Sequence, residues 1–116
     1  MKNKQAPTPF VSLVLEDDYE DFADFYGCNR IKIYNAILKL FQHFEKSSET
    51  VLELKIDAKI TNIPWDTKFK FDVTTDVVVL KRDLLPFYVD SEYYEVASEI
   101  LRLTKTLDNQ NNKRLK

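Results

Sequence analysis

Two neighbouring segments in the middle of the chain alternate apolar and charged residues with a period of two. The first segment, VLELKIDAKI at 51–60, has apolar side chains at Leu52, Leu54, Ile56, Ala58 and Ile60. The second segment, KFKFDVT at 68–74, has them at Phe69, Phe71 and Val73. Because successive side chains of a β-strand point to opposite faces, the pattern predicts two strands that each bury one face.

The residues between these strands favour a turn. Segment 61–67, TNIPWDT, contains the turn-forming residues Asn62, Pro64 and Asp66, so the two strands are expected to form a hairpin. The apolar run at 77–83 is open to two interpretations, as a continuation of the hairpin or as a third strand. Trp65 either folds over the edge of the core or marks a contact site.

Helical patterns flank the hairpin. Segment 30–46, with Asn29 as its expected N-cap, has an apolar stripe made of Ile33, Ile37, Leu40, Phe41 and Phe44. Segment 92–107 has a second stripe made of Tyr93, Val96, Ala97, Ile100, Leu103 and Leu107. A strand is expected at 9–16, and a connector containing Pro86 at 84–90.

These elements predict an α+β fold with a small antiparallel sheet of three to four strands and helices packed on one face. The predicted core packs the hairpin residues Leu52, Leu54, Ile56, Phe69, Phe71 and Val73 against the helix residues Ile33, Ile37, Leu40, Phe41 and Ile100. The chain of 116 residues fits a single domain at 9–107, with flexible tails at 1–8 and 108–116.

The composition excludes several classes of site. Gly27 is the only glycine, so neither a phosphate-binding loop nor a dinucleotide fingerprint can form. Cys28 is the only cysteine, which rules out an internal disulfide and favours a reducing compartment. No apolar run is long enough to span a membrane, and no apolar segment follows the first lysines. The sequence therefore predicts a cytoplasmic protein that binds no cofactor and no membrane.

The most unusual stretch is the acidic-aromatic segment, residues 16–26. Its aromatic residues, at helical spacing, are Tyr19, Phe22, Phe25 and Tyr26. Its acids are Glu16, Asp17, Asp18, Glu20, Asp21 and Asp24. The pattern predicts a short helix with acids on one face, which begins near Asp17 or Asp18 and ends at Gly27 in a left-handed conformation.

The acidic-aromatic segment has two interpretations. The spacing of its acids does not match a calcium loop, and no observation separates two carboxylates into an acid and a base. The acids then either form a solvated helix face or steer a basic partner while the rings supply buried contact area. The candidate partner-binding residues are Asp17, Asp18, Tyr19, Glu20, Asp21, Phe22 and Asp24.

Three further features are candidates for functional sites. His43 stands alone on a lysine-rich helix, and no His, Cys and carboxylate set has the spacing of a metal site, so no metal ligand is predicted. Cys28 is interpreted as a small buried thiol. The lysines on the polar face of the hairpin, Lys55, Lys59, Lys68 and Lys70, alternate with acids, which favours cross-strand ion pairs over nucleic-acid binding.

The sequence as a whole predicts a non-enzymatic protein–protein interaction module, such as an accessory subunit, an adaptor or an inhibitor. It would use the acidic-aromatic segment to bind another protein with a basic surface. The alternative is a nucleic-acid-associated protein that uses the sheet-face lysines, although the interleaved acids disfavour it. A homodimer through a sheet edge or through the aromatic-rich helices is a further hypothesis, because the best strands contain no proline to protect their edges.

Overall fold

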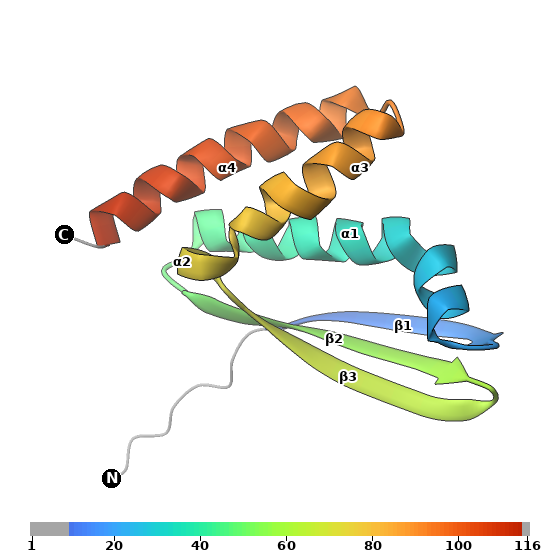
Figure 1. Cartoon of the computed structure of the whole chain (residues 1–116). Coiled ribbons are helices and arrows are strands. Elements are labelled where there is room, and N and C mark those ends of the chain that lie inside the picture. The colour runs from blue at the N-terminus through green and yellow to red at the C-terminus, as the bar shows by residue number, and fades with distance from the viewer. Residues whose placement is uncertain (1–9, 115–116) are drawn as a thin grey trace, which may run out of the picture.

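The computed structural model describes residues 10–114 and shows a sheet with helices layered over one face (Figure 1). The first half of the chain contains β1 (Phe10–Tyr19), α1 (Phe22–Lys46), β2 (Val51–Ile60) and β3 (Ile63–Asp72). The second half contains α2 (Val73–Asp76), η1 (Leu80–Leu84), α3 (Leu85–Asp90) and α4 (Tyr94–Arg114). The predicted tail at 1–8 lies outside the described residues.

The sheet has three strands in the order β1-β2-β3 and is mixed. β2 and β3 are antiparallel, as predicted, whereas β1 and β2 are parallel. The expectation of a purely antiparallel sheet was wrong because α1 carries the chain back along the sheet between the first two strands, and such a crossover makes them parallel. The α+β class and the position of the helices on one face agree with the prediction (Figure 1).

The hairpin turn is tighter than the sequence suggested. Only Thr61 and Asn62 connect β2 to β3, with φ values of 50° and 63°. Two consecutive positive φ values are the signature of a two-residue turn that matches the twist of the strands. Pro64, Trp65 and Asp66, expected in a longer loop, therefore belong to β3.

The apolar run at 77–83 forms no strand and lies in helical turns. Val77, Leu80 and Leu84 are buried at spacings of three and four, which is a helical period. Asp72 caps the preceding turn, because its Oδ1 accepts a hydrogen bond from the Thr74 N–H at 2.9 Å. The chain thus leaves the sheet at Asp72, and Pro86 lies in the first turn of α3.

The two helices predicted before and after Gly27 are one continuous helix, α1. Its N-cap is Asp21, and Gly27 does not have a positive φ. Asn29, expected as an N-cap, is buried inside the helix, where its Nδ2 donates to the Phe25 carbonyl at 2.9 Å. The stripe of Phe25 and Ile33 on one face explains why the helix continues through the glycine, since burial outweighs its cost of about 1 kcal/mol.

α4 extends beyond the predicted end at 107. Asn111 lies in the last part of this helix, is 7% exposed, and donates from Nδ2 to the Val73 carbonyl at 3.0 Å. The helix therefore includes residues 108–114, which the sequence assigned to a flexible tail. At its other end the helix begins at Tyr94, two residues later than expected.

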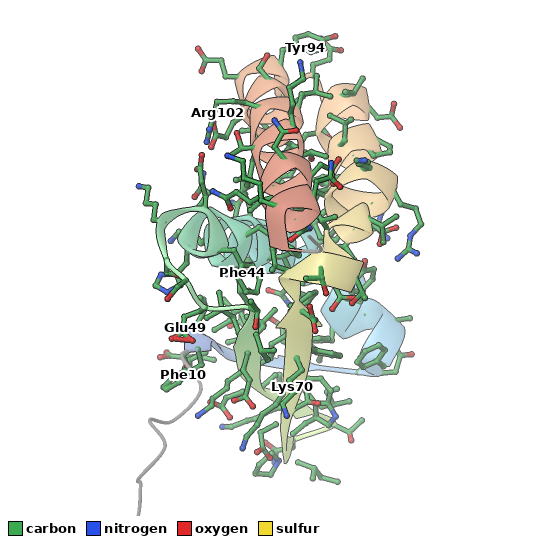
Figure 2. The ribbon with its side chains drawn as sticks, turned by 90° about the vertical axis from the view of Figure 1, so that its left-hand side faces the viewer. Phe10, Phe44, Glu49, Lys70, Tyr94 and Arg102 are labelled. Carbon is green, nitrogen blue, oxygen red and sulfur yellow. The ribbon has the colours of Figure 1, made fainter. Side chains whose placement is uncertain are left out.

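The core lies between the sheet and the helices, and Figure 2 shows Phe44 between these two layers. The predicted residues Leu52, Leu54, Ile56, Val73, Ile33, Ile37, Leu40, Phe41 and Ile100 are buried. The prediction was wrong for Phe69, whose side chain is 43% exposed, and Phe71 is only partly buried. The helices thus cover β2 more completely than β3.

Candidate functional site

The acidic-aromatic segment spans the end of β1, a short bend and the first turn of α1. Asp17 and Asp18 belong to β1, Glu20 and Asp21 form the bend, and Asp24 lies in α1. The sequence had placed all of these acids on a single short helix. The strand continues to Tyr19 because β1 pairs with β2 again at Asp18 and Tyr19, after an irregularity between Val14 and Asp18.

Three of the candidate acids hold the backbone in place. Asp21 Oδ1 accepts a hydrogen bond from the Asp24 N–H at 2.8 Å, and Asp24 Oδ2 accepts one from the Glu20 N–H at 3.0 Å. This reciprocal arrangement satisfies N–H groups that the helix start leaves unpaired. Asp18 Oδ1 accepts a hydrogen bond from the Asn62 N–H at 2.7 Å and so ties the hairpin turn to β1.

Two candidate acids are free for other interactions. Among the described residues, the exposed side chains of Asp17 and Glu20 make no hydrogen bond and no ion pair. In contrast to the carboxylates of Asp18, Asp21 and Asp24, their carboxylates accept no backbone hydrogen bond in this described part of the chain. They therefore offer substitutions that change the charge of this surface without disturbing its backbone.

The rings of the segment are divided between the core and the surface. Tyr19 is buried and packs edge-on against Phe25, with ring centroids 5.5 Å apart. Phe22 is 54% exposed and lies 5.6 Å from the ring of Trp65. Trp65, which is partly buried and also contacts Phe25 at 5.2 Å, lies at the edge of the core. Of the two ring candidates, Phe22 is thus the one exposed at the surface.

An apolar cleft of about 190 Å³ lies beside Phe22. It is lined by Phe22, Phe25, Tyr26, Ile33, Ile56, Trp65 and Phe69. A larger cavity of about 490 Å³ shares Tyr26, Ile33 and Phe69 with it and continues to Arg82 and Asp83. Together they form a groove between α1 and β3, which we call the α1–β3 groove.

The polar groups in the wall of this groove are neutral or paired. The hydroxyls of Tyr26 and Tyr34 are 3.0 Å apart, and burial together with this hydrogen bond raises the pKa of Tyr34 to about 12. Arg82 and Asp83 form a two-pronged ion pair with distances of 3.1 and 2.9 Å. The groove therefore presents mainly apolar surface, together with the Tyr34 hydroxyl, which stays protonated at neutral pH, and this suits an apolar ligand group.

Cys28 is exposed, and the expectation of a buried thiol was wrong. Its position on α1 places Sγ 3.5 Å from Asp24 Oδ1, four residues earlier. The hydrogen bond to this carboxylate and its negative charge raise the pKa of the thiol. A thiolate is the reactive form of cysteine, so the raised pKa lowers the reactive fraction of this exposed thiol.

We expect Asp24→Asn to accelerate the alkylation of Cys28 by iodoacetamide at mildly alkaline pH. Removing the carboxylate charge lowers the thiol pKa toward its ordinary value and increases the thiolate fraction. The measurement is the alkylation rate as a function of pH, followed by intact-mass spectrometry. Glu20→Gln removes the same charge without touching Cys28 and serves as the control, and equal rates in the two variants would contradict the assignment.

The described residues contain neither a metal-binding cluster nor a helix that could span a membrane. Between residues 10 and 114, no three His, Cys, Asp or Glu side chains are grouped so that they could hold a metal ion, and His43 is exposed on α1. In the same part of the chain, each helix is too short or too polar to cross a membrane.

The outer face of the sheet is charged, but its charges are not paired as predicted. The β2–β3 register places Glu53 opposite Lys70, which are opposite charges. It also places Lys55 opposite Lys68 and Asp57 opposite Asp66, which are like charges. Like charges directly opposite each other are unfavourable in a sheet. Cross-strand ion pairing therefore explains only part of this surface.

Comparison of the chain with protein-family models, with curated proteins and with solved structures gives no match. The acids and Phe22 were candidates from the sequence alone, whereas the α1–β3 groove and the exposed ring of Phe69 were not predicted. The alternation in 68–74 showed which way Phe69 points, but it contained no information on how far the helices extend over β3.

Proposed function

We propose that the chain is a non-enzymatic protein–protein interaction module, an accessory subunit, adaptor or inhibitor. The observation that carries the proposal is that half-exposed Phe22 stands beside an apolar cleft and follows two unpaired carboxylates, Asp17 near the end of β1 and Glu20 in the bend before α1. The exposed free thiol of Cys28 fits a reducing compartment, and we propose that the protein acts in the cytoplasm.

The chemistry of this surface defines the partner it would bind. A cleft of this size accommodates one apolar side chain, and aromatic anchors in such pockets dominate many interfaces. Acids around it would attract lysine or arginine and accelerate the encounter. The proposed partner is therefore a protein segment that presents an aromatic or large aliphatic side chain next to basic residues.

The test uses a peptide array whose members carry one central aromatic residue flanked by lysine and arginine. The matched array replaces the basic residues with acids. We expect the protein to bind the basic members in preference to the acidic ones, and Phe22→Ala to bind the basic members more weakly. Equal binding to the two arrays, or unchanged binding by Phe22→Ala, would remove the proposal.

Charge and ring contributions should also separate in kinetics. Asp17→Asn combined with Glu20→Gln is expected to slow association with a selected peptide and to flatten its salt dependence, because exposed charges are screened over about 8 Å at physiological ionic strength. Phe22→Ala is expected to accelerate dissociation instead. The control, Asp90→Asn with Glu95→Gln, removes two exposed charges elsewhere. An equal effect of the control pair would show that net charge, not this surface, sets the rate.

The sheet face supports a second candidate function, association with single-stranded nucleic acid. Lys55 and Lys68 lie opposite each other, and Lys55 Nζ lies 3.7 Å from the centroid of the exposed Phe10 ring. Basic residues with an exposed ring are a common platform for bases and phosphates. A raised 260/280 absorbance ratio in the purified protein, abolished by Lys55→Glu, would favour this candidate.

A further inference from the structure

β3 is an edge strand whose outer side is unpaired among the described residues. Ile60 and Ile63 flank a two-residue turn and therefore form a hydrogen-bonded pair. Because this pairing alternates along the ladder, Asp66, Lys68 and Lys70 turn their N–H and C=O groups away from β2. Such an edge is a template for a further strand, although β3, unlike the strand expected from the sequence, contains a proline, and Pro64 has no N–H to donate at this edge. The other edge strand, β1, is interrupted by its irregularity and is a poorer template.

The inner face of β3 carries apolar side chains that the helices leave uncovered. Ile63 is 64% exposed, Phe69 is 43% exposed, and Trp65 and Phe71 are partly buried. A strand added beside β3 would place its own side chains directly next to these residues. The edge therefore offers apolar contact area as well as backbone hydrogen bonds.

The charges of β3 fit poorly inside the chain. Lys68 faces Lys55, and Asp66 faces Asp57, so two positions of β3 repeat the charge of their neighbours in β2. Each of these pairs would be improved by exchanging the β3 residue for one of opposite charge. A further strand on the other side of β3 could supply the opposite charges that β2 does not place next to Asp66 and Lys68.

The sequence of β3 is chemically self-complementary about Thr67. Reading outward from Thr67, Asp66 mirrors Lys68, Trp65 mirrors Phe69, and Ile63 mirrors Phe71. An antiparallel copy centred on this residue would therefore pair opposite charges on the outer face, and apolar residues on the inner face. We propose that two copies of the chain form a dimer by antiparallel pairing of their β3 strands about Thr67, which makes one continuous six-stranded sheet.

Three neighbouring registers are less favourable. Centring the pair on Lys68 places that lysine against itself, and centring it on Asp66 does the same with an acid. Centring it on Phe69 places Lys68 against Lys70. The register about Thr67 avoids these repulsions and pairs each of the charges at 66 and 68 with an opposite charge.

The same register explains the like-charge pairs within the chain. Across the dimer, Asp57 and Asp66 of one copy would stand in a row with Lys68 and Lys55 of the second copy. Two acids of one copy then lie next to two lysines of the other. The twofold axis generates a second, equivalent row in which the two copies exchange roles. Figure 2 shows the labelled Lys70 on the same strand, where it would face Pro64 of the second copy. The inference concerns β3 and does not use the acidic-aromatic segment, so either proposal can fail alone.

The test uses two variants, Asp66→Lys and Lys68→Asp. Each replaces a like-charge pair within the chain by an opposite-charge pair, so each is expected to fold at least as well as the wild type. Each also places like charges in both symmetric contacts of the dimer. The dissociation constant of the dimer should therefore rise by roughly tenfold or more. An equimolar mixture of the two variants restores opposite charges at both contacts and should form a heterodimer.

The measurement is the mass in solution by light scattering at micromolar and higher concentrations. The proposal is supported if the wild type has a mass of twice 13.7 kDa, each variant alone has a lower mass, and the mixture regains the mass of the dimer. A wild-type mass of 13.7 kDa throughout the range overturns it. A dimer that resists both variants, or one that the mixture does not recover, overturns the pairing about Thr67.

A cross-link tests the register directly. In a Cys28→Ser background, Thr67→Cys should form an intermolecular disulfide under mild oxidation, because facing residues of a non-hydrogen-bonded pair have Cβ atoms about 4.5–5.5 Å apart. Lys70→Cys is the control, since the two copies of that residue would lie several residues apart along the paired strands. Cross-linking of Lys70→Cys in preference to Thr67→Cys overturns the register.

Discussion

Phe44→Ala is expected to lower the free energy of unfolding by about 3–5 kcal/mol, the usual cost of truncating a fully buried aromatic residue. Phe44 has no exposed surface and packs against Phe41, with ring centroids 5.4 Å apart. It lies on α1 between the sheet and the helices, so its loss leaves a cavity that neither layer can close. Because a domain of this size has about 5–15 kcal/mol of stability in total, the effect should be large in urea denaturation.

Phe22→Ala is the matched control, because it removes the same side chain from the same helix. Its ring is 54% exposed and contacts Trp65 and Phe25 from the surface side. We expect a loss of no more than about 1.5 kcal/mol, the value of an aromatic pair beyond its burial. Similar losses in the two variants would show that the assigned face of α1 is wrong.

Asn111→Ala is expected to destabilise the protein by about 1–3 kcal/mol, because it leaves the Val73 carbonyl without this donor in a buried setting. The hydrogen bond connects the end of α4 to the start of α2, two elements far apart in the sequence. Loss of the contact should therefore also increase amide hydrogen exchange in the last turns of α4.

The neighbouring residue provides the control for this second experiment. Asn112 is exposed in the same helix, and Asn112→Ala should change the stability by less than about 0.5 kcal/mol. Both variants remove an asparagine from the same turn, so helix propensity affects them equally. If the two urea midpoints coincide, the last turns of α4 do not pack as described. That result would instead favour a flexible tail from residue 108, as the sequence predicted.

Local periodicity was sufficient for the elements that bury a single face. The strict alternation in 51–60 predicted β2 and the inward direction of Leu54, and the stripe in 30–46 predicted the buried face of α1. These patterns are reliable because they reflect the geometry of one element against one apolar layer. The acids of the candidate surface could also be identified from the sequence, because the charge of a residue type does not depend on the fold.

Local signals failed where distant contacts competed with them. Gly27 and Asn29 looked like the end of one helix and the start of the next, yet α1 continues through both. The valines at 77–79 looked like a strand, yet their position after Asp72 places them in helical turns under α4. In each case the burial of side chains against other elements outweighed an intrinsic preference of about 1 kcal/mol or less per residue.

The α+β class, the inward faces of β2 and α1, and the charge of the segment before α1 could all be predicted from the residues alone. The parallel pairing of β1 with β2, the burial of Tyr19 but not of Phe22, and the incompletely covered edge at β3 became visible in the folded chain. Periodicity reports only the direction in which a side chain points. Whether that side chain is buried depends on which distant element packs against it. The residue pattern of a single strand or helix does not identify this element.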